Sequence, residues 1–96
     1  MESQKIENLL NLALQSTSYE REKSQELTEG YSPSTNSWEL IIKYHGELEN
    51  LRSMNILVEP LINGYCIVTI REDLIPALAS LNQVEYIEMP KRLFFA

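Results

Sequence analysis

The sequence predicts an α+β fold in which two helices cover one face of a four-stranded antiparallel sheet. Three observations lead to this prediction. Residues 38–89 contain four short runs with apolar side chains at alternate positions, the pattern of half-buried strands. Segments with apolar residues at three- and four-residue spacing follow the first and third runs. An Asn-Gly pair between the second and third runs predicts a tight hairpin.

The first strand and the first helix of this domain follow one another directly. The strand is predicted over 38–44, where apolar side chains recur at every second position: Trp38, Leu40, Ile42 and Tyr44. The helix is predicted over 47–54, where apolar side chains recur at every third position: Leu48, Leu51 and Met54.

Residues 55–62 and 65–71 are the second and third predicted strands. The intervening Asn63 and Gly64 both tolerate positive φ, which a type I′ turn requires at its two central positions. The two strands are therefore expected to be antiparallel neighbours.

The second helix is predicted to begin at Glu72 and Asp73, which supply a capping group and negative charge at the positive end of the helix dipole. Pro76 fits the first helical turn, and Asn82 ends the helix. The apolar stripe of this helix is Leu74, Ile75, Leu78 and Leu81.

The last strand is predicted over 84–89 and stops at Pro90, which cannot donate a hydrogen bond to a neighbouring strand. The resulting order is β-α-β-β-α-β, the ferredoxin-like arrangement.

The N-terminal third is predicted to be an extension of this domain. Residues 4–16 form an amphipathic helix whose apolar stripe consists of Ile6, Leu9, Leu10, Ala13 and Leu14. A polar, turn-rich linker reaches residue 37. The chain is thus divided into an N-terminal helix and linker (1–37), a ferredoxin-like core (38–89) and an extended tail (90–96).

Charge and composition exclude several classes of function. The 96-residue chain carries a net charge of −6, which argues against binding to nucleic acid or to an anionic membrane and favours protein partners. No apolar stretch approaches the roughly 20 residues that span a bilayer, and the N-terminus lacks the basic and apolar regions of a signal peptide. We expect synthesis in the cytoplasm without a signal peptide.

The residue types that carry catalysis are sparse. His45 is the single histidine, and Cys66, the single cysteine, lies in an apolar run that predicts a buried, inert thiol. Two pairs of nearby carboxylates stand at predicted helix starts: Glu47 with Glu49, and Glu72 with Asp73. The sequence therefore predicts no catalytic residue, no metal site and no cofactor.

Two features instead point to a protein partner. The sheet face away from the helices is expected to present a group of side chains too apolar for a solvated surface: Ile41, Leu57, Tyr65, Ile67 and Tyr86. The chain also ends in the apolar tail Leu93-Phe94-Phe95-Ala96, which adds nothing to the predicted core. We expect that this end was made by cleavage and that a partner holds it.

The last strand also carries a family resemblance. Val84-Glu85-Tyr86-Ile87-Glu88 resembles the Val-x-Tyr-Val-Glu pattern of the prodomains of subtilisin-like serine proteases, in which the glutamate lies eight residues before the cleaved end. The spacing from Glu88 to Ala96 matches, and the resemblance covers residues 38–96.

The resemblance implies a function without catalysis in this chain. Such a prodomain helps its protease to fold and then inhibits it, remaining as a non-covalent partner after cleavage. Glu88 would cap a helix of the protease. In the substrate groove Ala96 would be P1, Phe95 P2, Phe94 P3 and Leu93 P4. The family often has a second carboxylate where this chain has Pro90.

In its N-terminal extension and its lack of a signal peptide, the chain resembles the germination proteases of spore-forming bacteria. This similarity implies a parent protease that activates the precursor of a spore-cortex hydrolase, and a prodomain that is incorporated into the spore.

Two other interpretations fit the same residues. A free-standing ferredoxin-like regulatory module would pair its open face with a second copy or bind a small effector. A separately encoded protease inhibitor would share the fold without being part of a precursor.

Overall fold

The computed structural model describes residues 5–23, 30–54 and 56–90. Its helices are α1 (Asn8–Gln15), α2 (Ser18–Lys23), α3 (Glu49–Arg52) and α4 (Ile75–Ala79), the last preceded by the 3₁₀ turn η2 (Glu72–Leu74). Its strands are β1 (Tyr31–Ser32), β2 (Ser37–Tyr44), β3 (Leu57–Pro60), β4 (Tyr65–Arg71) and β5 (Val84–Glu88). None of the helices in the described ranges is long and apolar enough to cross a bilayer.

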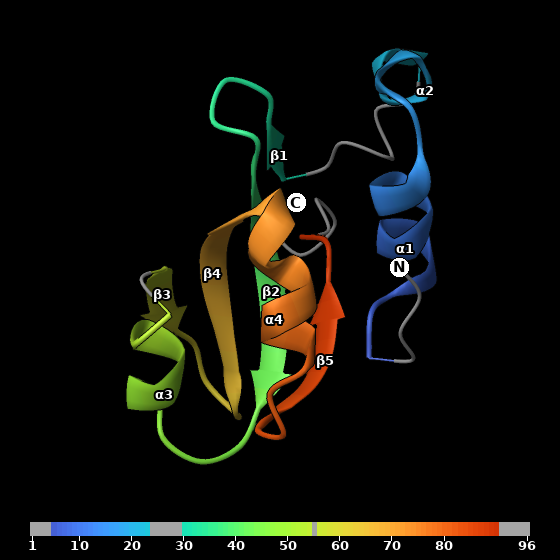
Figure 1. Cartoon of the computed structure of the whole chain (residues 1–96). Coiled ribbons are helices and arrows are strands. Elements are labelled where there is room, and N and C mark those ends of the chain that lie inside the picture. The colour runs from blue at the N-terminus through green and yellow to red at the C-terminus, as the bar shows by residue number, and fades with distance from the viewer. Residues whose placement is uncertain (1–4, 24–29, 55, 91–96) are drawn as a thin grey trace.

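The strands form one antiparallel sheet with β2 at its centre (Figure 1). β4 lies along one side of β2, and β3 lies on the far side of β4. The other side of β2 is shared, because β1 pairs with its first residues and β5 with its last. The path across the sheet is β1-β2-β4-β3, with β5 pairing β2 on the same side as β1, and the predicted combination of helices with an antiparallel sheet is confirmed.

The sheet has five strands rather than the predicted four, because the segment predicted as a linker contributes β1. Gly30 O accepts a hydrogen bond from Glu39 N at 2.8 Å, and the Tyr31 ring lies 5.0 Å from the Trp38 ring, measured between centroids. A turn over 33–36 reverses the chain between β1 and β2. Tyr31 thus packs against a buried tryptophan, and this contact stabilises β1. The residues around Tyr31 are polar, so the sequence contains no sign of this strand.

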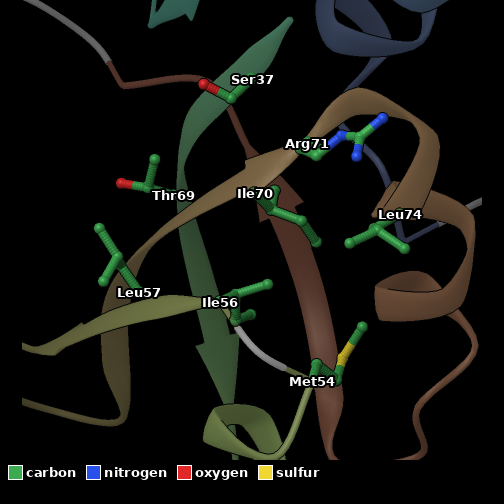
Figure 2. Close-up of a pocket in the computed structure, with 8 residues that line it drawn as sticks. All are labelled: Ser37, Met54, Ile56, Leu57, Thr69, Ile70, Arg71 and Leu74. Atoms are coloured by element: carbon green, nitrogen blue, oxygen red, sulfur yellow. The ribbon is translucent and has the colours of Figure 1, made fainter. Parts of the chain in front are cut away.

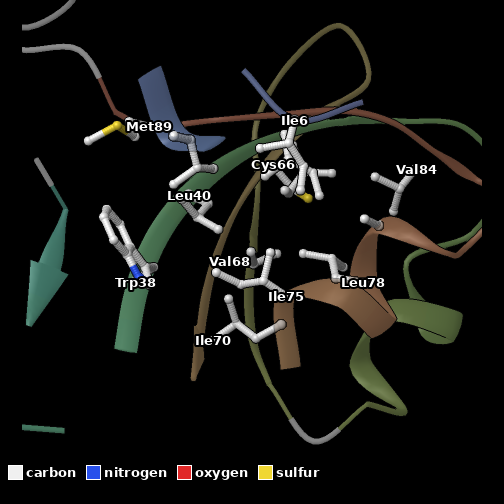
Figure 3. Close-up of a cluster of buried hydrophobic side chains, with 14 of the residues drawn as sticks. Ile6, Trp38, Leu40, Cys66, Val68, Ile70, Ile75, Leu78, Val84 and Met89 are labelled. Atoms are coloured by element: carbon white, nitrogen blue, oxygen red, sulfur yellow. The ribbon is translucent and has the colours of Figure 1, made fainter. Parts of the chain in front are cut away.

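The core lies between the sheet and the helices α1, α3 and α4 (Figure 3). Its buried side chains come from both: Trp38, Leu40 and Ile42 of β2, Cys66, Val68 and Ile70 of β4, Val84 and Ile87 of β5, Leu10 and Ala13 of α1, Leu51 of α3, and Ile75, Leu78 and Ala79 of α4. Ile6 and Met89 complete it from outside the regular elements. The period-2 and helical patterns of the sequence therefore identified the residues that pack.

The first helix is shorter than the predicted 4–16, because its first residues pair with the sheet instead. Ile6 forms a parallel bridge with Ile87 at the outer edge of β5, and α1 begins only at Asn8. Ile6 and Leu10 are buried, whereas Leu9, which was predicted to lie in the same stripe, is 36% exposed.

The hairpin between β3 and β4 has the predicted geometry. Asn63 and Gly64 have φ values of 60° and 78°, and Tyr65 N donates to Ile62 O at 3.3 Å across the turn. A Cβ at Gly64 would lie 3.2 Å from Tyr44 O. Glycine is therefore favoured at this position both by the backbone conformation and by the neighbouring strand.

Candidate functional site

One face of the sheet carries the apolar residues that the sequence assigned to it. Side chains directly opposite each other in an antiparallel sheet point to the same face. β2 residue Ile41 pairs with Ile67 of β4, and Lys43 pairs with both Tyr65 of β4 and Tyr86 of β5. Leu57 of β3 pairs with Thr69 of β4, two residues after Ile67. Hence the five predicted residues share one face, here called the open face: Ile41, Leu57, Tyr65, Ile67 and Tyr86.

The open face is distinct from the core face, because the buried residues of α1, α3 and α4 pack with the alternate side chains of the strands. Leu57 is 73% exposed, and Tyr65 and Tyr86 are 38% and 39% exposed. Ile41 and Ile67 lie between them and are half-buried. The arrangement is an apolar centre with aromatic and aliphatic side chains around it, which is a common composition for a protein-binding surface.

Charged side chains flank this apolar centre. Glu88 lies opposite Ile41, and Glu59 lies opposite Ile67, so one row across the sheet has a carboxylate at each end. In the next row Lys43 Nζ lies 5.5 Å from the centre of the Tyr65 ring. Glu88 was singled out in the sequence, and it occupies the end of the open face from which the chain leaves β5.

The predicted tail, Leu93-Phe94-Phe95-Ala96, lies outside the described residues. The structure describes the chain as far as Pro90, which follows Met89 and the end of β5. Met89 is buried, at 2% exposed.

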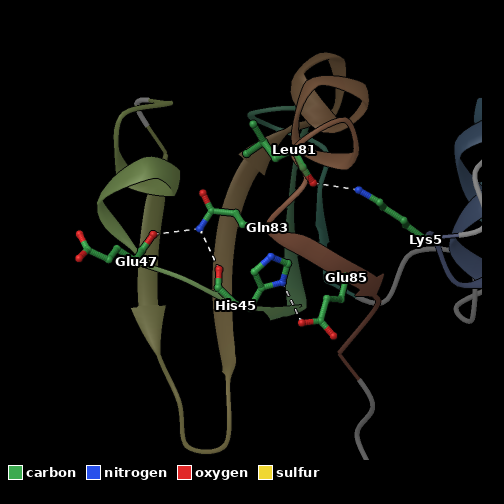
Figure 4. A network of polar contacts seen from close by, with 6 residues as sticks. All are labelled: Lys5, His45, Glu47, Leu81, Gln83 and Glu85. Atoms are coloured by element: carbon green, nitrogen blue, oxygen red, sulfur yellow. Dashed lines mark hydrogen bonds and ion pairs between the residues drawn. The ribbon is translucent and has the colours of Figure 1, made fainter.

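The contacts of His45 join neighbouring elements of the fold. Its Nδ1 lies 3.0 Å from Glu85 Oε2, which joins the end of β2 to the start of β5 (Figure 4). Gln83 Nε2 donates to the carbonyl oxygens of His45 and Glu47 at 3.2 and 2.9 Å. These contacts hold together the loops at one end of the sheet. Within residues 5–23, 30–54 and 56–90, no three His, Cys, Asp or Glu side chains gather as metal ligands would.

Cys66 is buried in the core, as the sequence predicted. Burial raises the pKa of its thiol from 9.0 to about 11, because a thiolate would lose its solvation there. The thiol is therefore protonated at neutral pH, and a protonated buried thiol is a poor nucleophile.

The acidic residues before α4 act differently from the prediction. The structure records no side-chain hydrogen bond that caps η2 or α4. Instead Glu72 Oε1 accepts a hydrogen bond of 2.9 Å from Trp38 Nε1, and Asp73 Oδ1 lies 3.3 Å from Arg71 Nε. The prediction of a capping side chain was wrong, because the buried indole N–H requires an acceptor and Glu72 is placed to supply it.

A pocket of about 440 Å³ was not predicted (Figure 2). It forms because β3 begins at Leu57, opposite Thr69, whereas β4 continues to Arg71. Its lining consists of Ser37, Met54, Ile56, Leu57, Thr69, Ile70, Arg71 and Leu74. Apolar side chains line it together with the polar Ser37, Thr69 and Arg71, and a sequence offers no local signal for a pocket between separate elements.

A family comparison supports the prodomain interpretation. The model of the Csp protease B prodomain matches residues 4–91, which is nearly the whole chain. The chain belongs to the Csp protease B prodomain family. The resemblance to a protease prodomain is therefore confirmed, and the matched region includes the N-terminal helices as well as the sheet.

A solved structure agrees with this assignment. The prodomain is 29% identical to a chain in the structure of the Clostridium perfringens CspB protease, with a TM-score of 0.50. The similarity covers 70% of the prodomain and 77% of that chain. These similar shares mean that the matched chain is of nearly the same length as the prodomain. Comparison with curated proteins gives no significant match.

The family assignment makes this chain a non-catalytic portion of a protease. Its expected partner is accordingly a protease catalytic domain.

Proposed function

We propose that the chain is the autocleaved prodomain of a subtilisin-like serine protease, first assisting the folding of the catalytic domain and then inhibiting it. The observation that carries the proposal is the open face, an exposed apolar sheet surface in a member of the Csp prodomain family. A surface of this kind favours a permanent protein partner, and the partner of a prodomain is its own protease.

The open face is the proposed docking surface. Its half-buried centre, Ile41 and Ile67, is surrounded by more exposed aliphatic and aromatic side chains. Tyrosine side chains at such a boundary bury a large area while their hydroxyl groups stay at the polar rim. Tyr65 and Tyr86, on opposite sides of Lys43, have this arrangement.

Glu88 is proposed to cap a helix of the protease. The first N–H groups of a helix lack partners within the helix, and the helix dipole is positive at that end, so a carboxylate is favoured there. The position of Glu88 at the edge of the open face, opposite Ile41, supports this role because a helix lying on the apolar centre can end beside it.

The tail is proposed to lie in the substrate groove as an added β-strand, with main-chain hydrogen bonds supplying affinity and alternate side chains entering pockets. Ala96 is P1, Phe95 P2, Phe94 P3 and Leu93 P4 in this proposal. The cleaved tail then inhibits as a retained product. The similar length of the matched chain in the CspB protease structure supports a prodomain that persists as a separate polypeptide.

The chaperone role follows from the order of folding. A large protease domain with many non-local contacts folds slowly, and a small sheet that forms first offers a surface on which its helices can assemble. The extensive pairing of β2 with β4 and β5 provides such a surface. We also propose that β2 to β5 with α3 and α4 form a ferredoxin-like unit, since their strand order is β5-β2-β4-β3.

The family assignment supports a proposed biological setting. The parent protease would activate the precursor of a spore-cortex hydrolase during germination. The precursor would be made in the cytoplasm and incorporated into the spore.

Intact-mass analysis of the native material tests the proposal. We expect this chain of 11.1 kDa to copurify with a larger chain that begins immediately after Ala96. A chain that purifies alone as a stable homodimer would instead support the free-standing regulatory module. A stop codon after Ala96 would support the separately encoded inhibitor.

A further inference from the structure

The chain leaves β5 through two residues that the N-terminal third of the molecule contacts. Met89 N donates a hydrogen bond of 2.9 Å to Oε1 of Glu7, a residue 82 positions earlier in the sequence. Met89 is also buried, so its backbone has little freedom. The last residue before Pro90 is therefore held by a side chain from the opposite end of the protein.

Glu7 is itself fixed against β5 by backbone pairing. Ile87 N donates to Lys5 O at 2.7 Å, and Glu7 N donates to Ile87 O at 2.8 Å. The intervening Ile6 is 2% exposed and its side chain lies in the core (Figure 3). Lys5 Nζ also donates to Leu81 O at 2.8 Å (Figure 4). This segment is thus attached along the edge of β5 at several points.

Gly30 holds the next residue from a different direction. A Cβ at Gly30 would lie 2.8 Å from Cδ and Cγ of Pro90 and 2.6 Å from Glu39 O. The Pro90 ring therefore lies directly against the backbone of Gly30, which is hydrogen-bonded to β2 through Glu39 N. Gly30 also has φ +85°, a conformation that L side chains rarely adopt.

We propose that Glu7 and Gly30 are positioning residues for the inhibitory tail. With Met89 and Pro90 they form what we call the tail anchor, which fixes the point from which residues 91–96 continue. The inference rests on the proposed function, because it assumes that the tail binds in the groove. It adds that the N-terminal third, rather than the sheet alone, determines how the tail reaches that groove.

The physical reason is pre-organisation. A strand that enters a groove must arrive in one register, because a shift by one residue exchanges the side chains that face the pockets with those that face away. A tail that continues from a fixed Pro90 loses less conformational freedom on binding than one that continues from a mobile residue. Loosening the tail anchor is therefore expected to weaken binding only when the tail is present.

A double-mutant cycle tests this expectation. Glu7→Met removes the acceptor for Met89 N but preserves side-chain length, whereas Glu7→Gln retains an acceptor oxygen. Each variant is prepared with the complete tail and with residues 93–96 deleted, and its dissociation rate from the mature protease is measured by surface plasmon resonance. Circular dichroism at the same temperature checks that every variant is folded.

We expect Glu7→Met to accelerate dissociation roughly ten-fold when the tail is complete, as for a lost hydrogen bond, and to have no effect without residues 93–96. Glu7→Gln should stay within about two-fold of the original chain, since an amide oxygen also accepts. An equal effect of Glu7→Met in both backgrounds, or no effect in either, would refute the positioning role.

This inference can fail while the proposed function stands, and deletion of the tail distinguishes the two cases. If deletion of residues 93–96 leaves the dissociation rate of the original chain unchanged, the tail does not contribute to binding, and both proposals are wrong. Gly30→Ala supplies a second measurement in the same cycle, because its Cβ would displace Pro90. It should also accelerate dissociation only in the presence of the tail.

Discussion

The indole Nε1 of Trp38 donates a hydrogen bond of 2.9 Å to Oε1 of Glu72, which joins the start of β2 to the turn before α4. Trp38 is the largest fully buried side chain of the core. A buried N–H that loses its acceptor costs its desolvation free energy, so this bond matters more for stability than a surface contact does.

Glu72→Ala is therefore expected to lower the free energy of unfolding by about 1–3 kcal/mol, and Glu72→Gln by less because its amide oxygen still accepts. Urea denaturation followed by tryptophan fluorescence measures both. The matched control is Asp73→Ala, since Asp73 makes an exposed ion pair with Arg71 and its loss should cost less than about 1 kcal/mol. Equal losses for the two alanine variants would contradict the role of the indole.

Cys66 predicts a particular pH dependence of stability. Its pKa is about 11 in the folded chain and 9.0 in the unfolded chain. Below pH 9 the thiol is protonated in both states, so its contribution to the free energy of unfolding does not change with pH. Between pH 9 and 11 only the unfolded state releases the proton, so the free energy of unfolding falls by roughly 1.4 kcal/mol per pH unit from this group.

The comparison of the original chain with Cys66→Ala isolates this effect from other titrations. The difference in their free energies of unfolding should be constant below pH 9. Above pH 9 the original chain should lose stability relative to Cys66→Ala. Thiol labelling provides an independent check at neutral pH, where the folded chain should react far more slowly than the unfolded chain. Rapid labelling of the folded chain would contradict the buried state of Cys66.

Two exposed tyrosines, one on the open face and one on α2, form a matched pair. Tyr86→Ala removes an aromatic side chain that is 39% exposed on the open face, whereas Tyr19→Ala removes one that is 65% exposed on α2. Tyr86→Ala should weaken binding to the protease about ten-fold, because a tyrosine beside the apolar centre of an interface buries a large aromatic surface. Tyr19→Ala should leave it unchanged. Titration calorimetry measures both affinities, and similar losses would exclude the open face as the docking surface.

Glu88 and Glu59 lie at opposite ends of one row across the sheet. Glu88→Gln should weaken binding by about two- to ten-fold at low ionic strength, because an amide lacks the charge that a helix N-terminus favours. The loss should shrink at high salt, where such interactions are screened. Glu59→Gln serves as the control and should have no effect. A loss at Glu88 that is independent of salt would argue against helix capping.

Much of the sheet could be predicted from residue alternation. The third predicted strand coincides with β4, and the first and last differ from β2 and β5 by one residue each. The reason is that the long central strands β2 and β4 each bury one side, so that apolar residues recur there at every second position. The same alternation assigned Ile41 and Ile67 to the open face, because neighbouring positions were needed for the core.

The parts that were missed depend on contacts between distant residues. β1 has two residues in a polar stretch, and its pairing with β2 and the contact of Tyr31 with Trp38 explain it. The residues just before α1 pair with β5 instead of forming a helical turn. This pairing depends on Ile87, 81 positions from Ile6, so it leaves no local signal in the sequence. One local signal was overlooked: Thr17 and Glu20 exchange hydrogen bonds at the start of α2, a capping box that is readable in the sequence.

The bridge between Ile6 and Ile87 also bears on the behaviour of the prodomain when no protease is present. An unpaired sheet edge can recruit the edge of another molecule and start aggregation. The N-terminal segment covers part of the outer edge of β5, and at the opposite edge Pro60 interrupts the row of donors on β3. Both edges are thus partly closed to pairing with the sheet of another molecule, so the open face rather than a sheet edge is the apolar surface that remains accessible.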